Sequence, residues 1–61
     1  MRGYEDVNAA VVSLSVGDTQ HAASIMDRCE DHTPLAEYVR ALVAARMQKE
    51  ANEVAERLER A

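Results

Sequence analysis

The 61-residue sequence contains no tryptophan or phenylalanine, only one cysteine, one proline and two glycines. Without large rings the core has to be aliphatic, and a single cysteine, Cys29, excludes an intrachain disulfide. A structural zinc site takes three or four Cys or His ligands, and the chain offers only Cys29, His21 and His32. A domain of this size buries only about 60% of the surface that its unfolded chain exposes. We therefore predict that association with a partner stabilises the chain, and that it is a dimer at micromolar concentration.

Basic residues are also in the minority, with 7 Lys and Arg against 11 Asp and Glu and a net charge of -4. This balance argues against holding nucleic acid by bulk charge, although it leaves room for a local basic site. No apolar run approaches the roughly 18 residues that a membrane span needs, and the first residues do not form a signal peptide. Together with the single cysteine, these features predict a cytoplasmic protein that does not enter a membrane.

The N-terminal part of the chain is open to two interpretations. Residues 1–10 have no clean periodicity and are predicted to form an N-terminal arm or a short helical turn. From residue 11 onward, Val12, Leu14 and Val16 alternate with serines, which is the period of a half-buried strand. The alternative is a helix over residues 4–16, with its apolar stripe at helical spacing: Tyr4, Val7, Val11 and Leu14. The strand is favoured because Val and Ser lower helix propensity.

Two helices are predicted after this segment. Asp18 is a good N-cap, and apolar residues then recur at spacings of three and four: Ala22, Ile25, Met26 and Cys29. Thr33 can cap a second helix in which Pro34 takes the first position and Glu37 lies in the first turn. That helix is expected to run for about 25 residues. The apolar side chains on its core-facing side are predicted to be Leu35, Tyr38, Val39, Leu42, Val43 and Met47.

The C-terminal end of the second helix continues with an apolar stripe at alternating spacings of three and four residues, formed by Ala44, Met47, Ala51, Val54, Leu58 and Ala61. This is the narrow stripe of a heptad repeat. The first predicted helix is too short to cover it. We therefore expect residues 48–61 to be a helical extension that binds a partner protein through Ala51, Val54 and Leu58. The alternative is that the same stripe extends the dimer, by packing on its symmetry mate or on the first helix.

A strand followed by two capped helices in under 50 residues resembles the ribbon-helix-helix family. The likeness covers residues 11–47 and is carried by Val12 to Val16, by Asp18 and by residues 33–43; its most similar part, Glu37-Tyr38-Val39-Arg40-Ala41-Leu42, resembles ParD-like antitoxins and Arc/MetJ-class repressors. The resemblance implies a mostly α protein with one short N-terminal strand, which pairs with the same strand of a second copy in an intertwined homodimer. The predicted organisation is then an arm at 1–10, a core at 11–47 and an extension at 48–61.

The family likeness also implies a mode of DNA binding, in which the two-stranded ribbon enters the major groove. The residues that it assigns to bases or phosphates are Val11, Ser13, Ser15, Thr33, Arg2, Arg28 and Arg40. The competing interpretation is that the two serines are only the solvated face of an amphipathic strand and that the arginines are ordinary surface charges.

Chemistry-bearing groups are sparse. Cys29 and His32 have the spacing of a metal-ligand pair, but Cys29 lies on an apolar stripe, where it serves as a small hydrophobic residue. No nucleophile with a base and no phosphate-binding loop is recognisable, so neither an enzyme nor a bound cofactor is predicted. The leading hypothesis is a DNA-binding transcriptional repressor, with an antitoxin as its specific case, in which the extension covers a toxin. The alternative is an all-α protein-interaction module, a helical hairpin or three helices with an exposed apolar stripe.

Overall fold

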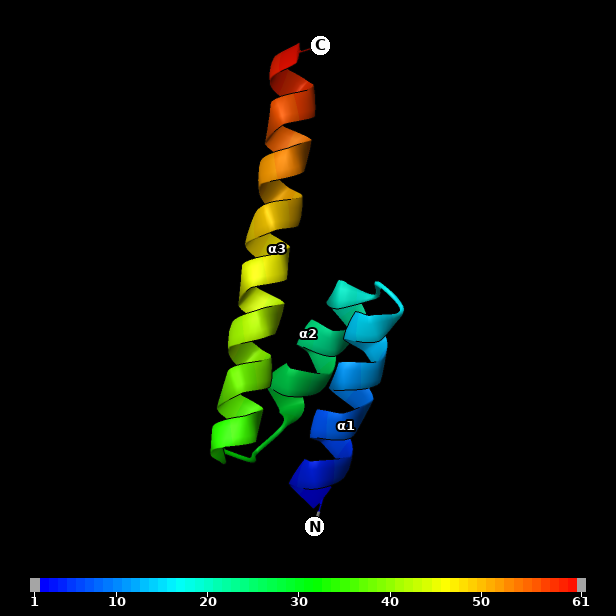
Figure 1. Ribbon diagram of the computed structural model, residues 1–61, viewed down its shortest axis with the longest axis vertical. Helices are drawn as coiled ribbons and strands as arrows, with labels where there is room; N and C mark the ends of the chain where they lie inside the picture. The colour runs from blue at the N-terminus through cyan, green and yellow to red at the C-terminus, as the bar shows by residue number, and fades with distance from the viewer. Residues whose placement is uncertain (1, 61) are drawn as a thin grey trace.

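The computed structural model describes residues 2–60, with the side chains of residues 4–60, and this part of the chain is folded into three helices. They are α1 (Arg2–Ser15), α2 (Thr19–Arg28) and α3 (Pro34–Arg60). Helices α1 and α2 pack together against the first half of α3, and α3 continues far beyond them (Figure 1). We call α1, α2 and the part of α3 up to Val43 the base. None of the described helices is both long and apolar enough to cross a lipid bilayer.

The core of the base is built from small and medium aliphatic side chains, with one fully buried alanine from each helix: Ala10, Ala22 and Ala36. Alanine at a helix contact lets the two backbones approach closely. Around these alanines lie the remaining buried apolar residues, Val7, Leu14, Ile25, Met26, Cys29, Val39 and Val43. The prediction that Cys29 serves as a small core residue is therefore confirmed.

The prediction of an N-terminal strand, and with it the ribbon-helix-helix homodimer, is wrong. Residues 2–15 form α1, and within residues 2–60 no strand is present. Backbone groups of a lone strand would need a second chain, whereas a helix satisfies them locally. The helix also satisfies the serines, because the Ser13 hydroxyl donates to the Ala9 carbonyl at 3.0 Å and the Ser15 hydroxyl to the Val12 carbonyl at 2.7 Å. The all-α alternative fits the structure.

The end of α1 explains why Gly17 follows it. The Asp18 amide donates to the Ser13 carbonyl at 2.9 Å and the Gly17 amide to the Leu14 carbonyl at 3.1 Å. This pair of bonds is a Schellman motif, which places the residue after the helix in the left-handed region. Gly17 has a φ of +84°, a value that costs glycine little.

Both predicted starts of the later helices are confirmed. The Asp18 carboxylate accepts from the His21 amide at 3.1 Å, as an N-cap does. Pro34 is the first residue of α3, and the Thr33 hydroxyl accepts from the Ala36 amide at 3.3 Å. The predicted core face of α3 is only partly correct, because Val39 and Val43 are buried but Leu35, Tyr38, Leu42 and Met47 are exposed.

Candidate protein-interaction surface

The most conspicuous surface of the molecule is the second half of α3. Val43 is the last buried residue of the helix, and every residue from 44 to 60 is exposed. We call residues 44–60 the arm, a segment of α3 that is distinct from the N-terminal arm predicted for residues 1–10. At about 1.5 Å per residue its length is roughly 25 Å. The arm gives the molecule an elongated shape of 48 × 19 × 16 Å, and its radius of gyration of 13.1 Å exceeds the about 10.5 Å expected for a compact chain of this length.

One face of the arm carries four apolar side chains, which we call the arm stripe: Met47, Ala51, Val54 and Leu58. Exposure of the large side chains increases along the arm, from 44% for Met47 through 53% for Val54 to 72% for Leu58. The spacings of four, three and four residues keep the stripe straight along the helix. Ala61, also predicted to belong to this stripe, lies outside the described residues.

The arm stripe does not simply continue the core face of α3. At about 100° per residue, its centre is rotated by about 60° from the centre of Ala36, Val39 and Val43. A helix that packs on the arm stripe would thus lie beside α1 and α2 and not on top of them. The arm stripe is an additional face, adjacent to the core.

Two polar contacts attach the first turns of the arm to the base. An Arg46 guanidinium nitrogen donates to the Leu14 carbonyl at 2.8 Å, at the C-terminal end of α1 where a positive charge is favourable. The buried Thr19 hydroxyl donates to a Glu50 carboxylate oxygen at 2.7 Å, at the N-terminal end of α2. Arg46 and Glu50 are four residues apart on α3, so together they fix the corner between α1 and α2 against it. Sequence reasoning did not identify either contact.

A second apolar patch lies on the other flank of α3, within the base. Leu35, Tyr38 and Leu42 follow one another at spacings of three and four residues and are 38–56% exposed. They belong to the predicted core face of α3, but α1 and α2 pack on the adjacent face of that helix, which is formed by Ala36, Val39 and Val43. This patch is shorter than the arm stripe, and it ends where Lys49 replaces the apolar pattern.

A polar cluster fixes the connection between α2 and α3. The Arg40 guanidinium donates to the Glu37 carboxylate at 2.6 Å and to the Cys29 carbonyl at 2.8 Å, and a ring nitrogen of His32 lies 3.0 Å from the same Glu37 oxygen. The hydrogen bond from His32, followed by the charge of Arg40, lowers the pKa of Glu37 below its usual value of 4.5. These groups are surface exposed apart from the largely covered Arg40.

The residues predicted to contact DNA are not brought together. Ser13 is buried and bonded within α1, while Val11 is exposed on a different side of that helix. Ser15 bonds to its own helix, and Arg28 at the end of α2 donates to the Ser24 carbonyl at 3.3 Å. The remaining members of the set are scattered: Thr33 caps α3, Arg40 holds the α2–α3 connection, and the Arg2 side chain lies outside the described part.

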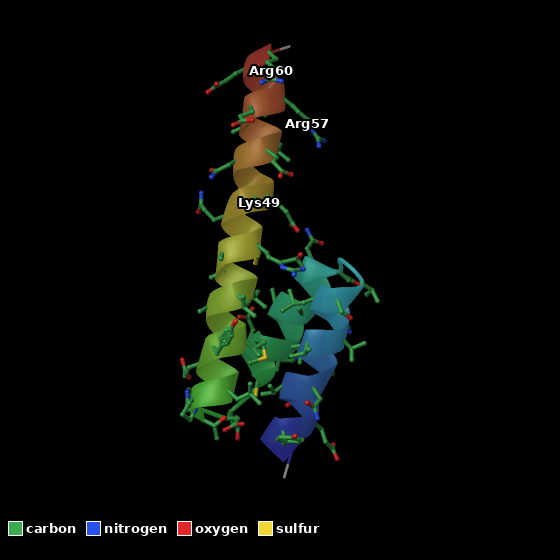
Figure 2. All side chains as sticks on the ribbon, in the orientation of Figure 1. Lys49, Arg57 and Arg60 are labelled. Carbon is green, nitrogen blue, oxygen red and sulfur yellow. The ribbon has the colours of Figure 1, made fainter. Side chains whose placement is uncertain are left out.

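The predicted partner-binding residues Ala51, Val54 and Leu58 do share one exposed face, whereas their role in binding stays a prediction. The arm around them is electrically balanced, since it holds four basic residues (Arg46, Lys49, Arg57 and Arg60) and four acidic ones (Glu50, Glu53, Glu56 and Glu59). The whole net charge of -4 therefore resides outside the arm. Figure 2 shows Lys49, Arg57 and Arg60 extending from α3 along the part that projects past the base.

No grouping of three or more His, Cys, Asp or Glu side chains that could hold a metal ion is present in residues 2–60. Comparison with known proteins gives no match for this chain, neither a family model nor a curated protein nor a solved structure. Function is accordingly inferred from the base, the arm and their charges.

Proposed function

We propose that the chain is a small all-α protein-interaction module, in which the base anchors α3 and the arm presents its apolar stripe to a helix of a partner. One observation supports this most directly. After its last buried residue, α3 keeps an apolar stripe of heptad spacing through an arm in which every residue is exposed. Helix-in-groove and coiled-coil partners recognise this kind of surface.

The stability of the arm as a helix favours an arm that is covered by a partner over one that is exposed to solvent. An isolated helix of fewer than about 12–15 residues is marginal in water, and the ten residues beyond Glu50 are all exposed. Glu53 and Arg57 have the spacing of a helix-stabilising pair, but no ion pair forms between them in the structure. Full burial of a large aliphatic side chain such as Val54 or Leu58 contributes about 1.5–3 kcal/mol. A partner helix is the simplest source of that stabilisation.

The proposal replaces the ribbon mechanism of DNA recognition, which requires a strand where α1 lies. DNA binding by another surface, repression and an antitoxin role stay predictions. The net negative charge of the residues before the arm does not favour them. We place the module in the cytoplasm, because its one cysteine is buried in the core and a single cysteine forms no intrachain disulfide.

Site-specific photo-crosslinking in cells that express the full chain tests this function. A crosslinking amino acid at Leu58 lies on the arm stripe, and the same group at Glu56 lies about 160° away around the helix. We expect a covalent protein adduct from position 58 and not from position 56. Absence of an adduct at 58, or equal adducts at both positions, refutes a partner on the arm stripe.

A further inference from the structure

We infer that the partner of the arm is a second copy of this chain, packed antiparallel on the first through the two arm stripes. This inference rests on the proposed function and adds the identity and the direction of the partner. It is carried by four properties of the structure: the order of side chains in the stripe, the charges beside it, the distribution of net charge along the chain, and the amount of exposed surface.

An antiparallel pair matches the stripe with itself. When the two-fold axis passes between residues 52 and 53, Met47 lies opposite Leu58 of the second copy, and Ala51 lies opposite its Val54. Symmetry repeats both pairs, which gives four successive layers. The smallest side chain of the stripe then faces a β-branched one, so no layer consists of two alanines.

The charges beside the stripe select the antiparallel direction. Glu50 and Arg57 each directly precede a stripe residue, on the flank of α3 that faces the base. In an antiparallel pair the equivalent flanks meet, so Glu50 faces Arg57 of the second copy, and the symmetric contact repeats this. In a parallel pair, the residue facing Glu50 is Ala55, and no charge pair forms.

Both groups are available for such a contact. Arg57 makes no hydrogen bond or ion pair in the described part of the chain, and Figure 2 shows it extending from the projecting part of α3. Thr19 donates to only one oxygen of Glu50, which leaves the second carboxylate oxygen for the guanidinium of the other copy.

The distribution of net charge favours the same direction. The arm is neutral and the residues before it carry a net charge of -4. A parallel pair would therefore place the negatively charged three-helix parts of the two copies side by side. The antiparallel pair separates the two Val43 positions by about 29 Å along the axis, several times the Debye length of about 8 Å at physiological salt. The dipoles of the two α3 helices are then also opposed, which is favourable.

The exposed area is on the scale that a dimer interface needs. The chain has an accessible surface of 4762 Å², whereas a compact monomer of 6.7 kDa is expected to have about 3,900 Å². The excess of about 860 Å² compares with the about 800 Å² that each partner buries in an interface of standard size.

Charge-reversal substitutions test both the identity of the partner and the antiparallel direction of packing. Sedimentation equilibrium of the full chain should give a dimer of twice 6.7 kDa. Arg57→Glu, which places an acidic group opposite Glu50 in each of the two symmetric contacts, should weaken the dimer about tenfold, a change that corresponds to about 1.4 kcal/mol. Glu50→Arg should weaken it as well. Affinity should recover in an equimolar mixture of the two variants and in the double variant, where opposite charges face each other again.

Arg60→Glu is the matched control, because it makes the same change of charge on the side of the arm away from the stripe, and it should leave the dimer unchanged. Equal effects of Arg57→Glu and Arg60→Glu, or absence of recovery in the mixture and the double variant, overturn the antiparallel pair. Spin labels at Ala41→Cys in a Cys29→Ala background give an independent measure. They should be about 35 Å apart along the axis, whereas a separation near 10 Å establishes a parallel pair and refutes the inference.

The crosslink at Leu58 separates failure of this inference from failure of the proposed function. An adduct with twice the mass of the chain supports self-pairing. An adduct of another mass, with a monomer in sedimentation, keeps the interaction module and overturns the second copy as its partner. A monomer without any adduct overturns both.

Discussion

Two alanine substitutions in α1 separate the helical N-terminus from a strand. In the helix, Leu14 is 5% exposed and packs in the base, while Val12 is 62% exposed. In a strand of period two, both side chains would point to the same apolar side. Leu14→Ala and Val12→Ala therefore have similar effects in a strand and opposite effects in the helix.

The structure gives the expected magnitudes. Leu14→Ala removes buried methyl groups and leaves a cavity, which costs about 2–5 kcal/mol. A chain of 61 residues has a total stability of about 3–9 kcal/mol, so this variant should be largely or wholly unfolded. Val12→Ala removes a solvent-exposed side chain and introduces a better helix former, so it should change the free energy of unfolding by no more than about 0.5 kcal/mol, toward greater stability.

Urea denaturation followed by far-ultraviolet circular dichroism measures both effects on one scale. The protein concentration has to be equal in all samples, because the dimerisation that we infer would contribute to the apparent stability. A loss of 2 kcal/mol or more in Val12→Ala, on the order of the cost in Leu14→Ala, would refute the packing of α1.

Three further substitutions test individual contacts. Gly17→Ala meets no atom within 4 Å but forces alanine to a φ of +84°, so urea unfolding should show a loss of about 1 kcal/mol; an unchanged midpoint would contradict the helix end. Arg46→Met, which removes the bond to the Leu14 carbonyl, should lower the stability by about 1 kcal/mol in the same assay, whereas Lys49→Met should not. Because the pKa of Glu37 is lowered in the folded chain, its stabilising contribution is complete above 4.5 and is lost as the pH falls through the lower folded value. Glu37→Gln should therefore be less stable than the parent near neutral pH and show a smaller loss of urea midpoint in acid; equal pH profiles of the two proteins would contradict this contact.

The sequence was sufficient to predict α2, the start of α3 and its long course. Asp18 and Pro34 have strong positional preferences that depend on only a few neighbouring residues, and both take the predicted positions. The exposed stripe of Ala51, Val54 and Leu58 was predictable for a related reason, since a helix without interruption preserves the phase of its side chains.

The N-terminal segment was harder, because the alternation from Val12 to Val16 fits both a strand and part of a helix. Gly17 was the signal that could have decided it, as a glycine directly after a periodic segment is typical of a helix C-terminus. The helical alternative gave the core face only in part, because Val7 and Leu14 are buried. Its stripe contained Tyr4 and Val11, which are exposed, in place of the fully buried Ala10.

The same error occurs in α3, and alanine is the common cause. A pattern weighted by side-chain size selects Leu35 and Tyr38, but the residue of this part of α3 that is fully buried in the core is Ala36. Leu35 and Leu42 lie outside this core on one flank of α3, whereas the arm stripe is exposed because α3 continues past α1 and α2. Because Val54 and Leu58 are exposed on that part of α3, the partner helix that we propose has to come from outside the folded chain.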